Sequence, residues 1–276
     1  MSVSSVSLVN GSSSGGGQQQ SSRASPSPPV VERNEYDEEM RECSFYLRKA
    51  CGMLQFIKQE YVSKVERMSE MSIEVAKMPE LTVLGCDSVF YYCMGIGQLI
   101  AIQAAIISDA YTPTALARLC VQAVKLFDAA RQNSEESAKS VKRFSENFRI
   151  LMMQYSVLYR ALTLRYLAID ENKRENSGKS VLLISTAVNQ LEEMNIFQQV
   201  QIKTSGHLIH DFDLLLSYVK ETQVETRRLQ QRFERENRAV FRQPIPNVST
   251  LGELVPDGVL IPQVIPFEFP KNKVLV

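Results

Sequence analysis

The sequence has no excess of charge of either sign. Lysine and arginine together number 31, and aspartate and glutamate together also number 31. Proteins that bind nucleic acid or an anionic membrane through their overall field carry a surplus of positive charge. The composition therefore excludes both kinds of binding as a property of the whole molecule, and it predicts no nucleic-acid partner.

The sequence also lacks the residue patterns of catalytic and metal-binding sites. Its only histidines, His207 and His210, share one face of a predicted helix, but no third ligand completes the set that a catalytic zinc needs. No serine or cysteine lies in a nucleophile elbow, and no pair of carboxylates stands alone in apolar surroundings. We therefore predict a protein that is not an enzyme, with no catalytic residues, no metal site and no cofactor.

One short motif, SGKS at 177–180, resembles the end of a phosphate-binding loop. The complete loop needs a further glycine where this chain has Lys173, and it follows a strand, which the sequence does not predict here. We interpret the motif as an ordinary loop at the start of a helix.

Signals for secretion and lipid attachment are missing as well. The N-terminus has no basic region followed by an apolar stretch, and residue 2 is a serine where myristoylation needs glycine. The C-terminal NKVLV has no cysteine for prenylation. Five cysteines, an odd number, fall in predicted helices without metal-ligand spacing, which favours reduced thiols. These features predict a cytoplasmic protein without a membrane anchor of its own.

Only one uncharged apolar segment reaches the length of a membrane span. Residues 88–107 contain no charge, and about 20 such residues cross a bilayer. However, Gln98 and Gln103 lie in the middle, and no cluster of lysine or arginine flanks the segment to set its orientation. A helix that is apolar on nearly all faces is also typical of the centre of a multi-helix domain. We interpret 88–107 as a core helix; a membrane-embedded protein is the alternative.

The rest of the chain is dominated by helical periodicity. Residues 1–32 are rich in Ser, Gly, Gln and Pro and are predicted to be disordered. After them, apolar residues recur at spacings of three and four, and the breaks between helices are short. The pattern predicts an all-α domain of antiparallel neighbouring helices. The expected helices cover about 34–71, 81–109, 114–132, 137–169, 179–201 and 208–240, with QNSEES at 132–137 and DENKRENSGKS at 170–180 as connectors.

The end of the chain follows a different pattern. Residues 243–271 combine several prolines with aliphatic and aromatic residues and show no helical period. We predict an extended arm, which must lie on the helices because its apolar side chains would otherwise face water.

Three C-terminal segments occur in a characteristic order: SGHLIHDF, RENRAVFRQPIP and LIPQVIPFEFP. Together they resemble the end of the Bro domain of Alix-type proteins in the endosomal sorting (ESCRT) pathway, and the likeness is closest to the Brox-type members. It covers about residues 32–271, with a long N-terminal part of the Bro domain absent, so it implies a truncated domain over 33–271. It also implies a tetratricopeptide-like helix set whose arm returns along the core, with Ile265, Phe267 and Phe269 filling grooves.

The resemblance also implies a function and a site. Bro domains are adaptors that bind the C-terminal amphipathic helix of an ESCRT-III subunit of the charged multivesicular body protein class. The matching positions are Ala101 or Ile102, Ala115 or Leu116, and Leu119, and we select Ile102, Leu116 and Leu119; plain core packing is the alternative for each. The protein would then be recruited from the cytoplasm to endosomes by its partners. A Bro-like scaffold outside ESCRT, of the kind that serves Rho signalling, is the competing hypothesis.

Overall fold

The computed structural model describes residues 30–62, 64, 82–141, 145–198 and 209–268, and all of the regular structure in these ranges is helical. The fold class is therefore all-α, as predicted. The long helices, with the two turns that extend them, are α1 (Val30–Ile57) with η1 (Lys58–Val62), α4 (Val83–Ser108), α5 (Pro113–Val141), α6 (Glu146–Lys173), α7 (Ser177–Gln198), and α8 (Ile209–Glu236) with η3 (Asn237–Phe241).

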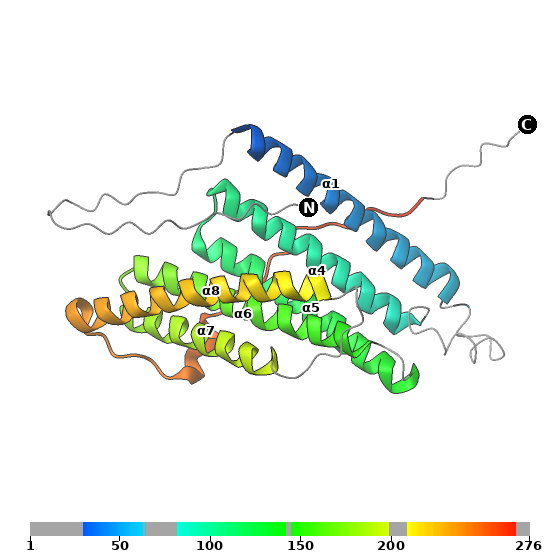
Figure 1. The fold of residues 1–276 in the computed structure, drawn as a ribbon. Coiled ribbons are helices and arrows are strands. Elements are labelled where there is room, and N and C mark those ends of the chain that lie inside the picture. The colour runs from blue at the N-terminus through cyan, green and yellow to red at the C-terminus, as the bar shows by residue number, and fades with distance from the viewer. Residues whose placement is uncertain (1–29, 63, 65–81, 142–144, 199–208, 269–276) are drawn as a thin grey trace, which may run out of the picture.

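The helices stack in the order of the chain. Each long helix packs on the next, from α1 through α4, α5, α6 and α7 to α8, which gives the antiparallel row visible in Figure 1. One continuous core runs through α4 to α8 and includes the fully buried side chains of Phe127, Leu158, Leu183 and Ile184. A smaller cluster of Cys51, Met94 and Leu126 joins α1 and α4 to α5.

One predicted connector is wrong and another is shorter than predicted; the helix expected at 137–169 begins instead at Glu146 as α6, after α5 ends at Val141. QNSEES does not interrupt α5, because its polar side chains are satisfied within the helix: Asn133 donates to the Ala129 carbonyl at 3.0 Å, and Ser134 donates to the Arg131 carbonyl at 2.7 Å. The predicted loop at 170–180 shrinks to the three residues between α6 and α7, where Glu175 adopts a positive φ of 62°.

The apolar segment at 88–107 forms most of α4. By length and composition this helix is able to cross a membrane, and it is the one helix of the described residues that is. In the structure it lies between α1 and α5 within the row, and its small residues allow close packing. Gly95, for example, faces the ring of Phe127, which would be only 2.7 Å from an added Cβ atom.

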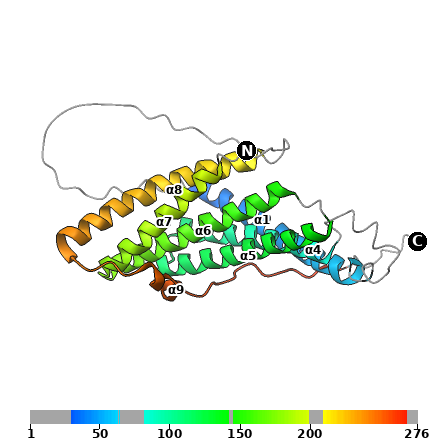
Figure 2. The same ribbon diagram turned by 90° about the horizontal axis from the view of Figure 1, so that it is seen from below.

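The arm follows η3 and crosses the row of helices back to α1. Figure 2 shows it passing along one side of the row, interrupted by a short turn, η4 (Val248–Thr250), and a single helical turn, α9 (Leu251–Leu254). The sequence did not predict these two turns. The prediction that the arm lies on the helices is confirmed by its backbone, which hydrogen-bonds to α5 through Val259 and to α1 through Ile265.

The aromatic end of the arm packs on α1. The ring of Phe267 lies 5.0 Å from that of Phe56, centre to centre, and Ile265 and Phe267 are both half-buried. The backbone approaches α1 so closely that a Cβ atom at Gly52 would lie 1.9 Å from the Ile265 carbonyl oxygen. Phe269 lies outside the described residues.

Candidate functional site: a groove between α1 and α4

The site begins with a buried glutamine in the most apolar helix. Gln98 of α4 is fully buried, and its amide nitrogen donates to the carbonyls of Leu119 at 3.1 Å and Val259 at 2.8 Å. Its amide oxygen accepts from the backbone N–H of Ile261 at 3.0 Å. The side chain therefore pairs with the arm much as a neighbouring strand would, and it fixes the arm against α4 and α5.

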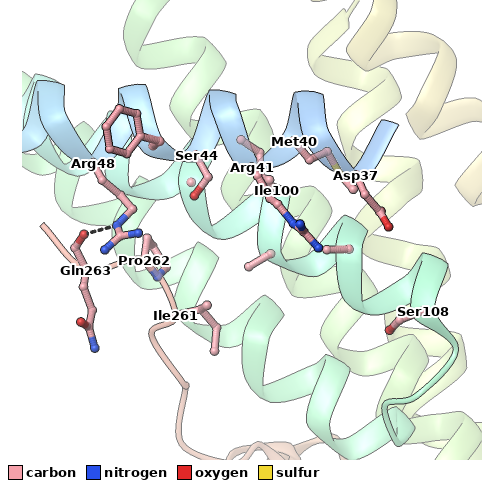
Figure 3. Close-up of a pocket in the computed structure, with 14 residues that line it drawn as sticks. Asp37, Met40, Arg41, Ser44, Arg48, Ile100, Ser108, Ile261, Pro262 and Gln263 are labelled. Atoms are coloured by element: carbon pink, nitrogen blue, oxygen red, sulfur yellow. Dashed lines mark hydrogen bonds between the residues drawn. The ribbon is translucent and has the colours of Figure 1, made fainter. Parts of the chain in front are cut away.

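The fixed arm closes one end of a groove between α1 and α4. The groove has a volume of about 790 Å³. Its end wall consists of Ile261, Pro262 and Gln263, and Arg48 of α1 donates to the Gln263 carbonyl at 2.5 Å. Figure 3 shows these arm residues below α1 and beside α4.

The floor of the groove is formed by α4, where four small residues and the larger Ile100 line it. Gly97, Ala101, Ala104 and Ser108 line it, at spacings of four, three and four residues, which places them on one face of the helix. Pro262 of the arm packs on Gly97, so the open part of the row runs from Ala101 to Ser108 and is about 10 Å long, or two helical turns. Small side chains let a second backbone approach closely, so this floor suits the face of a short helix.

The opposite wall combines apolar and charged side chains from α1. Met40 and Phe45 contribute apolar surface, while Asp37, Arg41 and Arg48 contribute charge. Arg41 and Arg48 both extend from α1 toward α4 in Figure 3. An apolar floor with two arginines along one side suits an amphipathic helix that carries carboxylates beside its apolar face.

The residues selected from the sequence lie beside this groove rather than in it. Ile102 is 3 % exposed and Leu119 is 4 % exposed, and both belong to the main core, on which the half-buried Leu116 also packs. Of the alternatives, Ala101 lines the groove floor. The α1 wall was not anticipated, because the resemblance pointed only to α4 and α5; the acidic and basic residues of 37–48 were its available signal.

Two thiols lie behind the groove, where α1 meets α4. The thiol of the buried Cys51 donates to the Phe90 carbonyl at 3.9 Å, and the half-buried Cys93 lies close to it. Hydrogen bonding between the two thiols lowers the pKa of Cys93, against the opposing effect of burial. The same hydrogen bond, together with burial, raises the pKa of Cys51 well above its ordinary value.

The structure also places the motifs considered for catalysis. Gly178 of SGKS lies in the first turn of α7, and its N–H donates to the Gln243 side chain at 3.1 Å, so the motif holds the arm. Within the described residues no group of three or more histidine, cysteine or acidic side chains is arranged to hold a metal. His210 belongs to α8, whereas His207 lies outside the described residues.

Comparison with solved structures gives the same fold. The ALIX BRO1 domain in complex with CHMP4C superposes with a TM-score of 0.67 at 13 % identity, covering 87 % of this chain and 59 % of that one. A structure that describes endosomal targeting by the Bro1 domain gives a TM-score of 0.63 at 13 % identity, covering 86 % and 58 %. ALIX in complex with a SIVmac239 late-domain peptide gives 0.66 at 12 % identity, covering 87 % and 30 %. The chain thus spans less than two thirds of each of these chains.

Comparison with protein families is more specific. No curated protein matches the chain. The model of the BRO1-like domain, however, matches residues 27–274, which is nearly all of the sequence outside the N-terminal segment. Together with the antiparallel helices and the returning arm, this match shows that the chain belongs to the BRO1-like domain family.

Proposed function

We propose that this chain is a non-enzymatic adaptor whose groove between α1 and α4 binds the C-terminal amphipathic helix of an ESCRT-III subunit. The observation that carries the proposal is the groove itself, with a two-turn open floor of mainly small residues, a wall of apolar and charged side chains that includes two arginines, and an end closed by the arm. Helix-in-groove recognition uses anchors at spacings of three and four, which match the spacing of the floor.

The family supports this choice of partner. BRO1 domains are binding domains without catalytic activity, and the ALIX BRO1 domain is known in complex with CHMP4C. Binding of the same class of helix would recruit this protein from the cytoplasm to endosomes. A closer relation to the Brox-type members, and a domain that begins near residue 33, remain predictions from the sequence.

The groove refines the site expected from the sequence. Ala101 belongs to both sets of residues. Ile102 and Leu119 would support the site indirectly, because they pack in the core beneath α4 and α5. Because Leu119 is 4 % exposed, a charged substitution there would unfold the core and could not test binding.

Calorimetric titration of the full chain tests the proposal. The titrant is a C-terminal helix peptide of a charged multivesicular body protein, beside a scrambled peptide of equal composition. We expect saturable binding of the native sequence alone. Folded protein, judged by circular dichroism, that binds neither peptide would overturn the proposal and favour a scaffold outside ESCRT.

A further inference from the structure

The end of α8 forms a corner that the groove does not use. There α8 passes into the π-helical turn η3, and the chain then reverses at Arg242, which has a φ of 50°. Helices usually end in this left-handed conformation with glycine, because a Cβ atom makes it costly. Here an arginine occupies the position, so the turn projects a guanidinium from the end of the helix.

The corner is held rigidly against the α6–α7 turn. The Asn237 side chain exchanges two 3.0 Å hydrogen bonds with the backbone of Gln243. The Gln243 side chain in turn donates to the Glu175 carbonyl at 2.8 Å and accepts from the Gly178 N–H. At Gly178 an added Cβ atom would lie 2.2 Å from the Pro244 carbonyl oxygen, so the strained turn is fixed on both sides.

Arginines gather on this corner without acidic partners of their own. Arg238 and Arg242 line a hollow of about 500 Å³ with Ile245, and Arg235 and Arg238 line an adjoining hollow of about 330 Å³. None of the three arginines forms an ion pair with a described residue. Glu234 lines both hollows, and the other nearby acid, Glu236, is already paired with Arg232 of α8, so the three arginines outnumber the one remaining carboxylate.

Aliphatic side chains stand exposed among these arginines. Val240, Ile245 and Val248 are 69 %, 55 % and 61 % exposed, although aliphatic residues normally favour burial. Figure 1 shows the corner, in orange, projecting at the end of α8, away from α1 and its groove. Exposed aliphatics beside arginines on a projecting turn are suited to a surface that is anionic outside and apolar beneath.

We propose that this corner binds an anionic membrane surface. Arg235, Arg238 and Arg242 would contact lipid phosphates, and Val240, Ile245 and Val248 would enter the acyl boundary. A phosphopeptide would use the arginines alone and would leave the aliphatics in water, so the membrane accounts for more of the corner. The zero net charge of the chain is compatible with this, because the positive charge is local.

Vesicle flotation with the full chain tests the proposal. We expect binding to phosphatidylcholine vesicles that contain phosphatidylserine, loss of this binding at high salt, and little binding to phosphatidylcholine alone. Arg238→Glu should weaken binding roughly tenfold or more, since each basic residue near such a surface contributes substantially. Lys220→Glu, an equal charge change on the exposed part of α8 far from the corner, should leave binding unchanged. Equal binding to both vesicle types, or equal effects of the two variants, would overturn the proposal.

A second arm separates a lipid surface from free phosphate. Val240→Ser keeps every charge and should weaken flotation while circular dichroism stays unchanged. Inorganic phosphate, titrated calorimetrically, should show no comparable binding. Phosphate binding that survives in Val240→Ser, together with unaltered flotation, would assign the arginines to a soluble anion and overturn the membrane proposal. Ala104→Glu in the groove should not affect flotation, so failure of this proposal can be distinguished from failure of the adaptor proposal.

Discussion

At the scale of single residues, Gln98 explains how an apolar helix carries specific recognition. A buried amide is costly unless it is paired, and in the described structure every partner of Gln98 is a backbone group of α5 or the arm. Because these bonds join α4, α5 and the arm, Gln98 fixes the arm at Val259 and Ile261, between its contacts with Arg118 and Arg48. The end wall of the groove depends on it in turn.

Replacement of Gln98 by leucine should therefore destabilise the fold. Gln98→Leu leaves the Leu119 and Val259 carbonyls and the Ile261 N–H without their partner, and we expect a loss of about 2–4 kcal/mol in the free energy of unfolding. Urea denaturation measures the change. Gln103→Leu is the matched control, since Gln103 is exposed on the same helix, and it should change stability by no more than about 0.5 kcal/mol. Equal effects of the two changes would contradict this role of Gln98.

The neighbouring thiols Cys51 and Cys93 lead to a prediction about the pH dependence of Cys93 alkylation. Because the hydrogen bond from Cys51 lowers the pKa of Cys93, Cys93 holds more thiolate at neutral pH and should react with iodoacetamide at lower pH than an ordinary thiol. Cys51→Ala removes the hydrogen bond, so the pH midpoint of Cys93 alkylation should rise, as followed by peptide mass spectrometry. Cys120→Ala, in the separate main core, should leave it unchanged. An unaltered midpoint in Cys51→Ala would argue against the pair.

At the scale of elements, the backbone of the arm contacts the helices directly, at positions where a helix carries glycine. The Ile265 N–H donates to the Arg48 carbonyl at 3.2 Å, a carbonyl that already belongs to the hydrogen bonding of α1. Such an approach requires glycine at position 52, one turn further along α1. The arm is therefore an integral layer of the fold and not an appended tail.

A methyl group at position 52 should displace the arm. We expect Gly52→Ala to cost about 1–3 kcal/mol as an overpacked contact, despite the better helix propensity of alanine. Hydrogen exchange of residues 257–268 should become faster. Gly252→Ala is the control, because an added Cβ there meets nothing within 4 Å. Exchange that stays slow in Gly52→Ala would show that the arm does not depend on this contact.

The local sequence pattern predicted the long helices and the arm. Apolar spacing identified each long helix, and proline content identified the arm, because both signals act over a few residues. The QNSEES segment was misjudged because serine and asparagine favour loops unless they find partners, and here Ser134 and Asn133 find them inside α5.

At the scale of the whole molecule, the contacts of α4 favour a core helix over a membrane span. Its amide side chain at Gln98 is paired with α5 and the arm, and its Asp87 is paired with Lys58 of η1 at 2.6 Å. A bilayer would offer neither partner.

We therefore predict that the protein behaves as a peripheral protein. Carbonate treatment of cell membranes should release it into the supernatant, while an integral membrane protein in the same sample stays in the pellet. A carbonate-resistant chain with α4 protected from protease would support the spanning alternative.

The groove could not have been assembled from the sequence, since it depends on three distant segments. Residues 37–48, 97–108 and 261–263 meet only in the folded chain. Ala101, one of the positions considered from the sequence, does line the groove floor. A shift of one residue rotates a helical position by about 100°, which is why Ile102 faces the core instead.

The most direct test of the central claim is calorimetric titration of the ESCRT-III helix peptide into two variants of the full chain. Ala104→Glu places a carboxylate on the groove floor, and Gln103→Glu makes a similar change on the adjacent, exposed position of the same helix. We predict that Ala104→Glu weakens binding at least about tenfold, because the charge would be buried under the bound helix, while Gln103→Glu binds like the native protein. Unchanged affinity in a folded Ala104→Glu protein would contradict the claim that the groove between α1 and α4 is the binding site.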